Sequence, residues 1–435
     1  MTRSRIKQIL CLVVGSLIIL CLPHSTALAE SPVDQLPRGL VPASSLEMEN
    51  SLRESAEPFE NVPVNVDTVL IGLRYDSTAV DYAELYDPSE AGFRVGTYDE
   101  DRVFHEELRL ESRSVSVYCN EDGSLTLTDW VNSYRRGPGE SFAVQVIGAE
   151  NGNTTAFREE RYHGGFLFLP WENGLMTVVN VVGLEDYVKG VIPYEMSASW
   201  SYEALRAQAV CARTYAAYNQ NAYEEYGFDL TADTESQVYR GVLQANEATD
   251  SAAASTAGQF IRYRGELCEI YYFASDGGAT EDGKNVFDSD RPYLSGKTDP
   301  FEAAVDFTME SWTLYRDGET ISYMLRQEGY EIGPVVSLYP FYSELGNVIA
   351  MTYRDADGNS LTLTGRESYS LIRLNNCRFT VSSTEEDGAI MFQFSGSGWG
   401  HNCGMSQWGA RAMAEIYGYS CEDIISFYFT GAYIA

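Results

Sequence analysis

One glutamate, Glu195, has neighbours that suit acid–base chemistry. It lies in Pro193-Tyr194-Glu195-Met196, and Trp200 follows shortly after. Such side chains can shield a carboxyl group from water, which raises its pKa because the charged form loses hydration. A carboxyl group kept protonated in this way can donate its proton to a glycosidic oxygen. The alternative is an ordinary surface or capping glutamate, which is the usual role of this residue type.

The number of carboxyl groups at such a site decides its chemistry. Most glycosidases use two, about 5–9.5 Å apart. The acidic residues near Glu195 in the sequence are Glu185, Asp186 and Glu203, and each is equally typical of an exposed helix position. A reaction in which a hydroxyl of the substrate replaces water needs only one carboxyl group, which acts first as acid and then as base.

A second informative stretch, Ser395 to Ala410, is too rich in glycine for an ordinary strand end. Glycines there permit positive φ angles and a close approach of a ligand to the backbone. Trp399 offers a flat face for a sugar ring, and His401, Ser406 and Gln407 offer hydrogen-bonding groups. We expect this stretch to meet Glu195 in one site. The alternative is a structural turn before a capped helix.

Metal and thiol chemistry have little support in this sequence. Apart from a histidine in the leader, the chain has only His105, His163 and His401, with no HExxH motif and no CxxC pair. His401 and Cys403 are close in sequence, but a nucleophile and its base must meet in space. Cys211 falls within a helical pattern and is typical of packing. We therefore predict no metal and no cofactor.

The elements around Glu195 follow from local signals. Residues 184–189 predict a short helix that ends at Gly190, and Pro193 predicts a break, which leaves Glu195 in a loop. A long helix should then begin near Ser199 or Ser201. One face of it carries small side chains, so another element can approach closely.

The two halves of the chain differ in pattern. Alternating apolar residues and turn signals predict strands between residues 67 and 183, and helices are concentrated after Gly183. This arrangement is typical of an α+β protein without sustained βαβ alternation. We predict a signal peptide at 1–29, a linker at 30–64, a β-rich N-terminal domain at 65–163, and a mixed α+β catalytic domain with a central Ala-rich helix at 164–435.

Charge and targeting signals limit the partners. The formal net charge of −33 disfavours nucleic acid, which is bound by neutralising its phosphates. A basic start, an apolar run from Ile9 to Leu22 and Ala27-Leu28-Ala29 fit a secretion signal. Retention of this segment as a membrane anchor is the alternative to cleavage. The six cysteines outside it are scattered, and we expect most to be small buried side chains.

Several ordered blocks resemble the family of stage II sporulation protein D and the LytB-like amidase enhancers. The two main blocks are Leu184 to Ala216, with Glu195-Met196 inside it, and Gly398 to Ala410. Shorter ones are Gln237 to Tyr239, Thr256 to Gln259 and Gly277 to Glu281. The resemblance covers roughly residues 165–434, and the strands before it look like an extension that many members carry.

This resemblance implies a secreted or membrane-anchored protein of the bacterial cell wall, with a place in wall remodelling and sporulation. It implies a lytic transglycosylase that cuts peptidoglycan glycan strands, with Glu195 as the catalytic residue. The expected substrate-binding residues are Tyr194, Gln208, Arg213, Ser275, Trp399, His401, Ser406 and Gln407.

The resemblance also bears on metal binding and on a competing function. Some members bind zinc through a histidine ahead of the Gly-Gly pair, but Phe273 stands there, so we predict no zinc. The competing function is a non-catalytic protein that binds peptidoglycan and enhances an N-acetylmuramoyl-L-alanine amidase. Its partner would be that amidase or another sporulation wall hydrolase.

Overall fold

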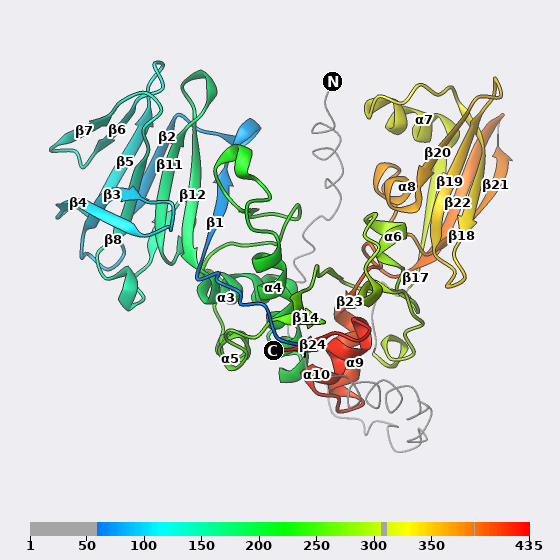
Figure 1. Ribbon diagram of the computed structural model, residues 1–435. Helices are drawn as coiled ribbons and strands as arrows, with labels where there is room; N and C mark the ends of the chain where they lie inside the picture. Colours follow the sequence, from blue (N-terminus) through cyan, green and yellow to red (C-terminus); the bar gives the residue numbers. More distant parts are fainter. Residues whose placement is uncertain (1–58, 306–310, 387) are drawn as a thin grey trace, which may run out of the picture.

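The computed structural model describes residues 59–305, 311–386 and 388–435. The expected signal peptide and residues 30–58 of the expected linker lie outside this part of the chain. Figure 1 shows three parts: a β-rich lobe on the left, a helical centre below, and a second β-rich lobe on the right. The chain contains both strands and helices in separate regions, which confirms the α+β class.

The left-hand part is a two-layer sandwich, which we call the sandwich lobe. Its larger sheet has the order β13-β1-β12-β11-β8-β3-β4, and the smaller has the order β10-β9-β2-β5-β6-β7. Side chains of both sheets meet in one apolar core. The larger sheet is formed by β1 (Thr68–Arg74), β3 (Phe93–Tyr98), β4 (Phe104–Leu110), β8 (Phe142–Val146), β11 (Gly165–Pro170), β12 (Met176–Gly183) and β13 (Leu230–Thr231).

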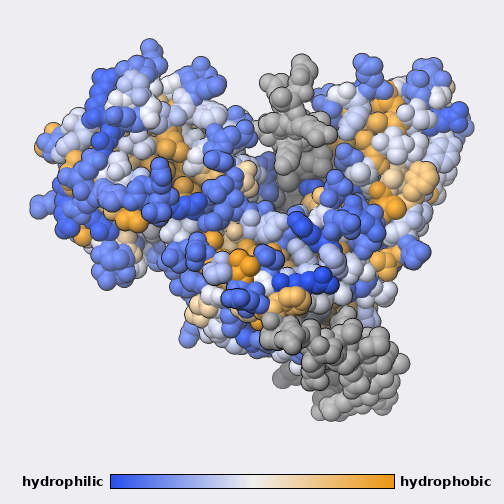
Figure 2. Space-filling model, viewed as in Figure 1, coloured by the Kyte–Doolittle hydropathy of each residue, from blue (hydrophilic) through white to orange (hydrophobic). Residues whose placement is uncertain are grey.

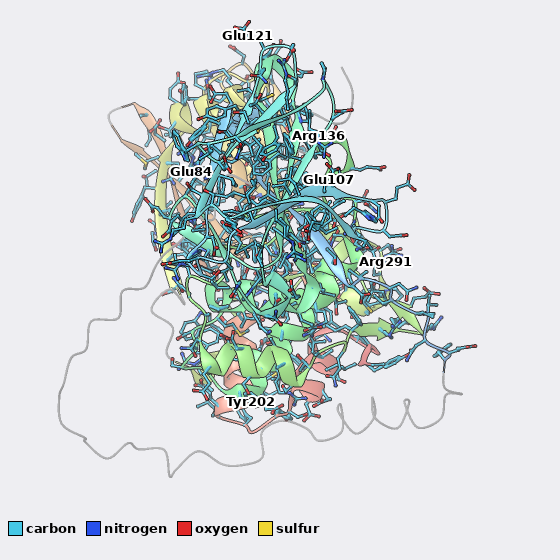
Figure 3. All side chains as sticks on the ribbon, turned by 90° about the vertical axis from the view of Figure 1, so that its left-hand side faces the viewer. Glu84, Glu107, Glu121, Arg136, Tyr202 and Arg291 are labelled. Carbon is cyan, nitrogen blue, oxygen red and sulfur yellow. The ribbon has the colours of Figure 1, made fainter. Side chains whose placement is uncertain are left out.

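The smaller sheet covers one face of the larger one. Its β2 alternates exposed and buried residues, as expected for a strand with one face on a core. Arg136 and Glu107, labelled in Figure 3, pair at 2.5 Å across the edges of the two sheets. Its strands are β2 (Tyr82–Tyr86), β5 (Ser114–Cys119), β6 (Leu125–Thr128), β7 (Ser133–Arg136), β9 (Thr155–Phe157) and β10 (Glu160–Tyr162).

Strand β12 connects this lobe to the helical centre. It is buried along almost its whole length because both faces of the sheet are covered, and Gly183 passes directly into α3 (Leu184–Glu195). The expected domain boundary at residues 163/164 falls between β10 and β11. Since β11 pairs with β8, the larger sheet takes strands from both sides of that boundary.

The helical centre is built around α4 (Tyr202–Tyr218). Small side chains on α4 let α3, α5 (Glu247–Ser255), α9 (Gln407–Glu415) and α10 (Cys421–Tyr428) pack closely against it. Two short parallel strands, β16 (Tyr272–Phe273) and β23 (Met405–Ser406), lie beside this bundle. Five of the six described cysteines are buried and none is in a disulfide, as expected for small apolar side chains.

Residues 311–397 form the right-hand part, which we call the insert lobe because it lies between β16 and β23. It has two three-stranded sheets, β17-β22-β21 and β18-β19-β20, and a core of its own. Most of the visible surface is hydrophilic, and apolar groups gather along this lobe (Figure 2). Its elements are β17 (Ser311–Asp317), α7 (Gly318–Gln327), β18 (Val335–Tyr342), β19 (Val348–Asp355), β20 (Ser360–Thr364), α8 (Gly365–Leu371), β21 (Phe379–Glu386) and β22 (Ala389–Ser397).

One local prediction was wrong. Gly190 does not end α3, which continues through Pro193 to Glu195. Gly190 is needed for packing instead, because a Cβ atom there would lie 2.4 Å from the ring of Tyr239. Elsewhere in the helical centre, β14 (Ile261–Tyr263) pairs with β15 (Glu266–Leu267), whereas β16 pairs with β23. None of the helices described has the length and apolar character needed to cross a bilayer.

Candidate active site

Glu195 is the last residue of α3, at the junction of the helical centre with β16 and α9. The residue as a whole is partly buried, and its carboxyl group is shielded from solvent. Tyr272 Oη donates a hydrogen bond to Glu195 Oε1 at 3.3 Å, and Gln407 Nε2 donates to Oε2 at 3.1 Å. The two expected sequence stretches therefore meet at this carboxyl group, as predicted.

A chain of hydrogen bonds fixes the Tyr272 hydroxyl. Gln237 Nε2 donates to Tyr272 Oη at 2.7 Å, and Gln237 Oε1 accepts from Tyr187 Oη at 3.1 Å. Tyr187 and Gln237 are buried, so this chain cannot easily rearrange. The donors at Glu195 are thus held in place before any substrate arrives.

The pKa of Glu195 is raised above its ordinary value because burial disfavours the carboxylate form. Hydrogen bonds from Gln407, Tyr272 and the backbone of Val238 act in the opposite direction and lower the pKa. The net shift is upward, so Glu195 keeps its proton to a higher pH than an exposed glutamate does, while the donors remain available to stabilise the carboxylate once that proton has left. This combination suits a group that must both donate and accept a proton.

Other carboxyl groups near Glu195 in sequence have partners of their own. Glu185 forms a two-bond ion pair with Arg213, at 2.9 and 2.7 Å. Asp186 pairs with Lys189, and Glu203 binds both Arg206 and the backbone N–H of Cys421. Among the described residues, no second carboxylate belongs to the hydrogen-bond network of Glu195.

Two expected substrate-binding residues lie inside the helical centre. Arg213 is fully buried and also donates to backbone oxygens near α5, so it joins α3, α4 and α5. Gln208 is also buried, and its Oε1 accepts from Gln407 Nε2 at 3.5 Å. Arg213 and Gln208 therefore support the elements around the site and form no hydrogen bond with Glu195, whereas Gln407 contacts Glu195 directly.

Ser275 and Ser406, two further expected substrate-binding residues, bind Glu302 and not Glu195. Both hydroxyls donate to Glu302, with a distance of 2.7 Å from Ser406 Oγ to Oε2. The backbone N–H of Asp276 donates to the same Oε2 at 3.0 Å. Ser406 also caps α9 by accepting from the N–H of Gly409 at 3.1 Å. These bonds fix the start of α9 and therefore the position of Gln407.

Glu302 belongs to a cluster of three buried carboxyl groups with Asp276 and Asp299, whose oxygens lie within 4.8 Å of one another. Burial and the charges of Asp299 and Glu302 raise the pKa of Asp276 well above its ordinary range. Burial also raises the pKa of Glu302. Asp299 accepts from Tyr428 Oη at 2.5 Å. The cluster is a hydrogen-bonded support beneath the Ser275 and Ser406 backbone segments.

His401 is held as a neutral ring. Its Nε2 donates to the backbone oxygen of Tyr272 at 3.0 Å, and its Nδ1 accepts from the N–H of Cys403 at 3.2 Å. Burial and the charge of Arg366 lower the pKa of His401 to about 3. The ring therefore positions β16, and its neighbour Phe273 offers no ligand atom. These residues do not fit a zinc ion.

The last two expected substrate-binding residues, Trp399 and Tyr194, lie in different surroundings. The backbone of Trp399 pairs with Ser275, with distances of 2.7 and 3.0 Å, and its side chain is partly exposed. The hydroxyl of Tyr194 is buried, and the charge of Glu160 in the sandwich lobe contributes to its raised pKa. Tyr194 is thus oriented toward the sandwich lobe, whereas Trp399 lies on the same loop as His401.

Tyr272 and Gln237 were missed as site residues. Both lie in short segments without periodic pattern, and their link to Glu195 arises only from tertiary contacts. The available signal was the family-like pattern: Gln237 begins one of the shorter blocks, and Tyr272 lies just ahead of the Gly-Gly pair.

Comparison with known proteins identifies the family of this chain. The family described as stage II sporulation protein matches residues 172–263, which include α3, Glu195 and α4. An uncharacterised protein of Brachyspira hyodysenteriae is 35% identical over 279 residues, which cover 62% of this chain and 71% of the relative. The chain belongs to the stage II sporulation protein D family.

Two Bacillus subtilis relatives connect this family membership to named proteins. Stage II sporulation protein D is 28% identical over 274 residues, which cover 59% of this chain and 76% of the relative. The protein named amidase enhancer is 29% identical over 289 residues, which cover 56% of this chain but only 39% of the relative. Similarity to this family thus extends well beyond the 172–263 segment.

Proposed function

We propose that this protein cleaves peptidoglycan glycan strands as a lytic transglycosylase with Glu195 as its single acid–base residue. The observation that carries the proposal is the environment of Glu195: a shielded carboxyl group with a raised pKa, held by neutral donors from Tyr272 and Gln407. Membership of the stage II sporulation protein D family supports a role in wall remodelling and sporulation.

In the first step, protonated Glu195 donates its proton to the glycosidic oxygen that leaves the muramic residue. The bond between C1 and that oxygen breaks, and positive charge develops on the sugar ring. Glu195 becomes a carboxylate at this moment. The hydrogen bonds from Tyr272 and Gln407 stabilise the new negative charge, and they require no reorganisation because their donors are already in place.

In the second step, carboxylate Glu195 accepts the proton of the 6-hydroxyl group of the same muramic ring. The 6-oxygen bonds to C1 and forms an anhydro sugar, and Glu195 returns to its protonated state. No water is consumed and no second base is required. The engagement of Glu185, Asp186 and Glu203 elsewhere supports a one-carboxylate reaction over a two-carboxylate hydrolysis.

The direct test compares the wild type with Glu195→Gln on purified glycan strands. General acid–base catalysis contributes about 10²–10⁴-fold, so we expect the variant to lose at least about a hundredfold in rate. Mass spectrometry of the released fragments measures cleavage, and circular dichroism checks that the fold is retained. Full activity of a folded Glu195→Gln protein would refute the assignment.

The second candidate function is a non-catalytic enhancer that binds the wall and a wall amidase. It is favoured by the relative named amidase enhancer and by the net charge of −33, which could attract a basic partner. It requires glycan binding without cleavage and a faster reaction of a separately added amidase. Either function places the protein outside the membrane, secreted or wall-associated, with the N-terminal segment as an anchor if it is retained.

A further inference from the structure

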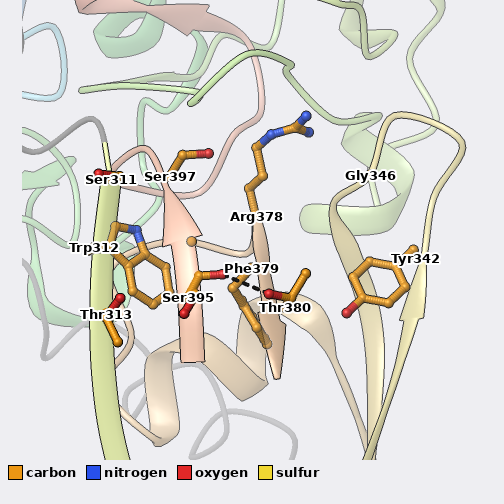
Figure 4. Close-up of a pocket in the computed structure, with 11 residues that line it drawn as sticks. Ser311, Trp312, Thr313, Tyr342, Gly346, Arg378, Phe379, Thr380, Ser395 and Ser397 are labelled. Atoms are coloured by element: carbon orange, nitrogen blue, oxygen red, sulfur yellow. Dashed lines mark hydrogen bonds between the residues drawn. The ribbon is translucent and has the colours of Figure 1, made fainter. Parts of the chain in front are cut away.

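The insert lobe contains an open cavity of about 540 Å³ that the reaction at Glu195 does not use. It is bounded by β17, β21 and β22 and by the turn between β18 and β19. Trp312 lies on one side, Tyr342 lies on the other, and Arg378 extends between them (Figure 4). The cavity thus combines aromatic walls with one cationic side chain.

Arg378 has unused hydrogen-bonding capacity. Its Nη1 donates to the backbone oxygen of Leu345 at 2.6 Å and to Asn347 Oδ1 at 3.4 Å. Within the part of the chain that the structure describes, Nε and Nη2 make no hydrogen bond, and no carboxylate pairs with the guanidinium group. Three N–H donors therefore remain for a ligand. Such an unpaired cation is notable in a chain with a net charge of −33.

Two glycines lie beside the guanidinium group of Arg378. A Cβ atom at Gly346 would lie 3.4 Å from Arg378 Nη1, and one at Gly278 would lie 3.9 Å from Nη2. Both glycines have positive φ angles, 85° and 118°, which favour glycine over other residues. The ring of Trp312 also requires Gly396, where a Cβ atom would lie 2.4 Å from the ring.

One stretch of chain links the wall of the cavity to the residues around Glu195. Ser397 lines the cavity and donates through Oγ to the backbone oxygen of Gly277 at 3.0 Å. Four residues later His401 binds the backbone of Tyr272, whose hydroxyl contacts Glu195. Ser397 and His401 are thus at most about 14 Å apart along the chain. This link is the reason to consider the cavity together with a polymeric substrate at Glu195.

We propose that this cavity is a binding subsite for a carboxylate-bearing unit of the glycan strand, with Arg378 as its anion-binding residue. The inference rests on the proposed function, because it assumes that a peptidoglycan strand occupies the site at Glu195. An arginine fork matches the two oxygens of a carboxylate, and the aromatic walls suit the apolar face of a sugar ring.

Two parts of peptidoglycan supply that carboxylate. One is the lactyl group of a muramic residue without its stem peptide, and the other is the peptide itself. Strands stripped of peptides, strands that retain them, and uncharged β-1,4-linked N-acetylglucosamine oligomers distinguish these sources. The first two carry different carboxylates, and the third carries none.

The experiment measures binding of these three probes to Glu195→Gln and to Glu195→Gln with Arg378→Gln. We expect the second change to weaken binding of one carboxylate-bearing probe by about tenfold or more and to leave the neutral oligomers unaffected. The affected probe identifies the source of the carboxylate. The difference should shrink as salt is raised.

Control variants separate binding from folding. Arg354→Gln removes an exposed arginine of the same lobe and should change nothing, and Arg378→Lys should restore part of the affinity if the protein folds. If both strands bind and Arg378→Gln lowers neither affinity, the inference is wrong and the proposed function stands. If the Glu195→Gln protein binds no strand at all, both fail.

Discussion

Glu195 and the nearby cluster of Asp276, Asp299 and Glu302 show how the surroundings of a carboxyl group determine whether it suits acid–base chemistry or structural support. Glu195 is partly exposed and accepts from two neutral side-chain donors. The cluster of Asp276, Asp299 and Glu302 is buried and lies behind the site. The pKa of Glu195 and the pKa of Asp276 in the cluster are both raised, and burial is the leading cause in each case. A raised pKa alone therefore does not identify a catalytic acid.

Glu195 and the cluster differ in their exposure and in their hydrogen-bond partners. The cluster oxygens accept from backbone N–H groups and from the hydroxyls of Ser275, Ser406 and Tyr428, so their bonds join segments of the protein. In the described part of the chain, Glu195 accepts only from Tyr272, Gln407 and the backbone of Val238, and its residue is partly exposed. We conclude that the cluster fixes the elements around Glu195, and we assign the proposed proton exchange to Glu195 and not to the cluster.

The largest expected difference concerns stability. Glu302→Ala leaves the hydroxyl of Ser275 and the N–H groups of Asp276 and Gly277 without their acceptor, and each buried unsatisfied group costs about 1–3 kcal/mol. We expect a loss of about 3 kcal/mol or more in the free energy of unfolding, measured by urea denaturation. Glu195→Gln should change this free energy by less than about 1 kcal/mol. Similar losses in both variants would remove the distinction between the two groups.

A smaller effect is expected from Tyr272→Phe. The Tyr272 hydroxyl stabilises the carboxylate form of Glu195, and a hydrogen bond to a charged group is worth about 1.5–3 kcal/mol. We expect kcat/KM for strand cleavage to fall by about tenfold. The pKa of Glu195 should rise further, which moves the alkaline limb of the pH–rate profile to higher pH.

Tyr271→Phe is the matched control for this change. The Tyr271 hydroxyl donates to Glu269 at 2.7 Å and not to Glu195. Its removal should leave both kcat/KM and the position of the alkaline limb unchanged. Equal effects of the two substitutions would mean that the Tyr272 hydroxyl has no specific role at Glu195.

The smallest effect concerns the pH dependence of stability. The pKa of Asp276 is raised in the folded state, so its contribution to stability is present below the unfolded value of about 3.9 and is lost as pH rises through the folded pKa. Asp276→Asn removes this titration. Between pH 4 and pH 8 the wild type should lose at least about 1 kcal/mol more stability than the variant does, measured by urea denaturation at each pH. Parallel curves would show that Asp276 ionises normally.

The sequence predicted the parts of the fold that depend on local pattern. The Ala-rich face of α4 and the concentration of strands before Gly183 were anticipated from periodicity and turn residues. The meeting of Glu195 with the 395–410 stretch was anticipated from the residue types of the two stretches, and both stretches also resemble one family. These signals are carried by the residues themselves or by their order along the chain.

Tertiary contacts could not be predicted in the same way. Gly190 is a common helix terminator, but here its missing side chain makes room for Tyr239, and α3 continues. Ser275, Ser406 and Arg213 have side chains suited to sugar binding, yet they are bound by Glu302 and Glu185. The separate core of the insert lobe also depends on contacts between strands far apart in sequence.

In the mechanism we propose, one carboxyl group performs the whole reaction, with a hydroxyl of the substrate in place of water. This is tested most directly by the mass of the new muramic ends that the wild-type protein releases from purified glycan strands. We expect anhydro ends, lighter by one water than the ends left by hydrolysis, and their loss in Glu195→Gln. Hydrated ends from the earliest time points would contradict it, because they require water as the nucleophile and a second group to activate it.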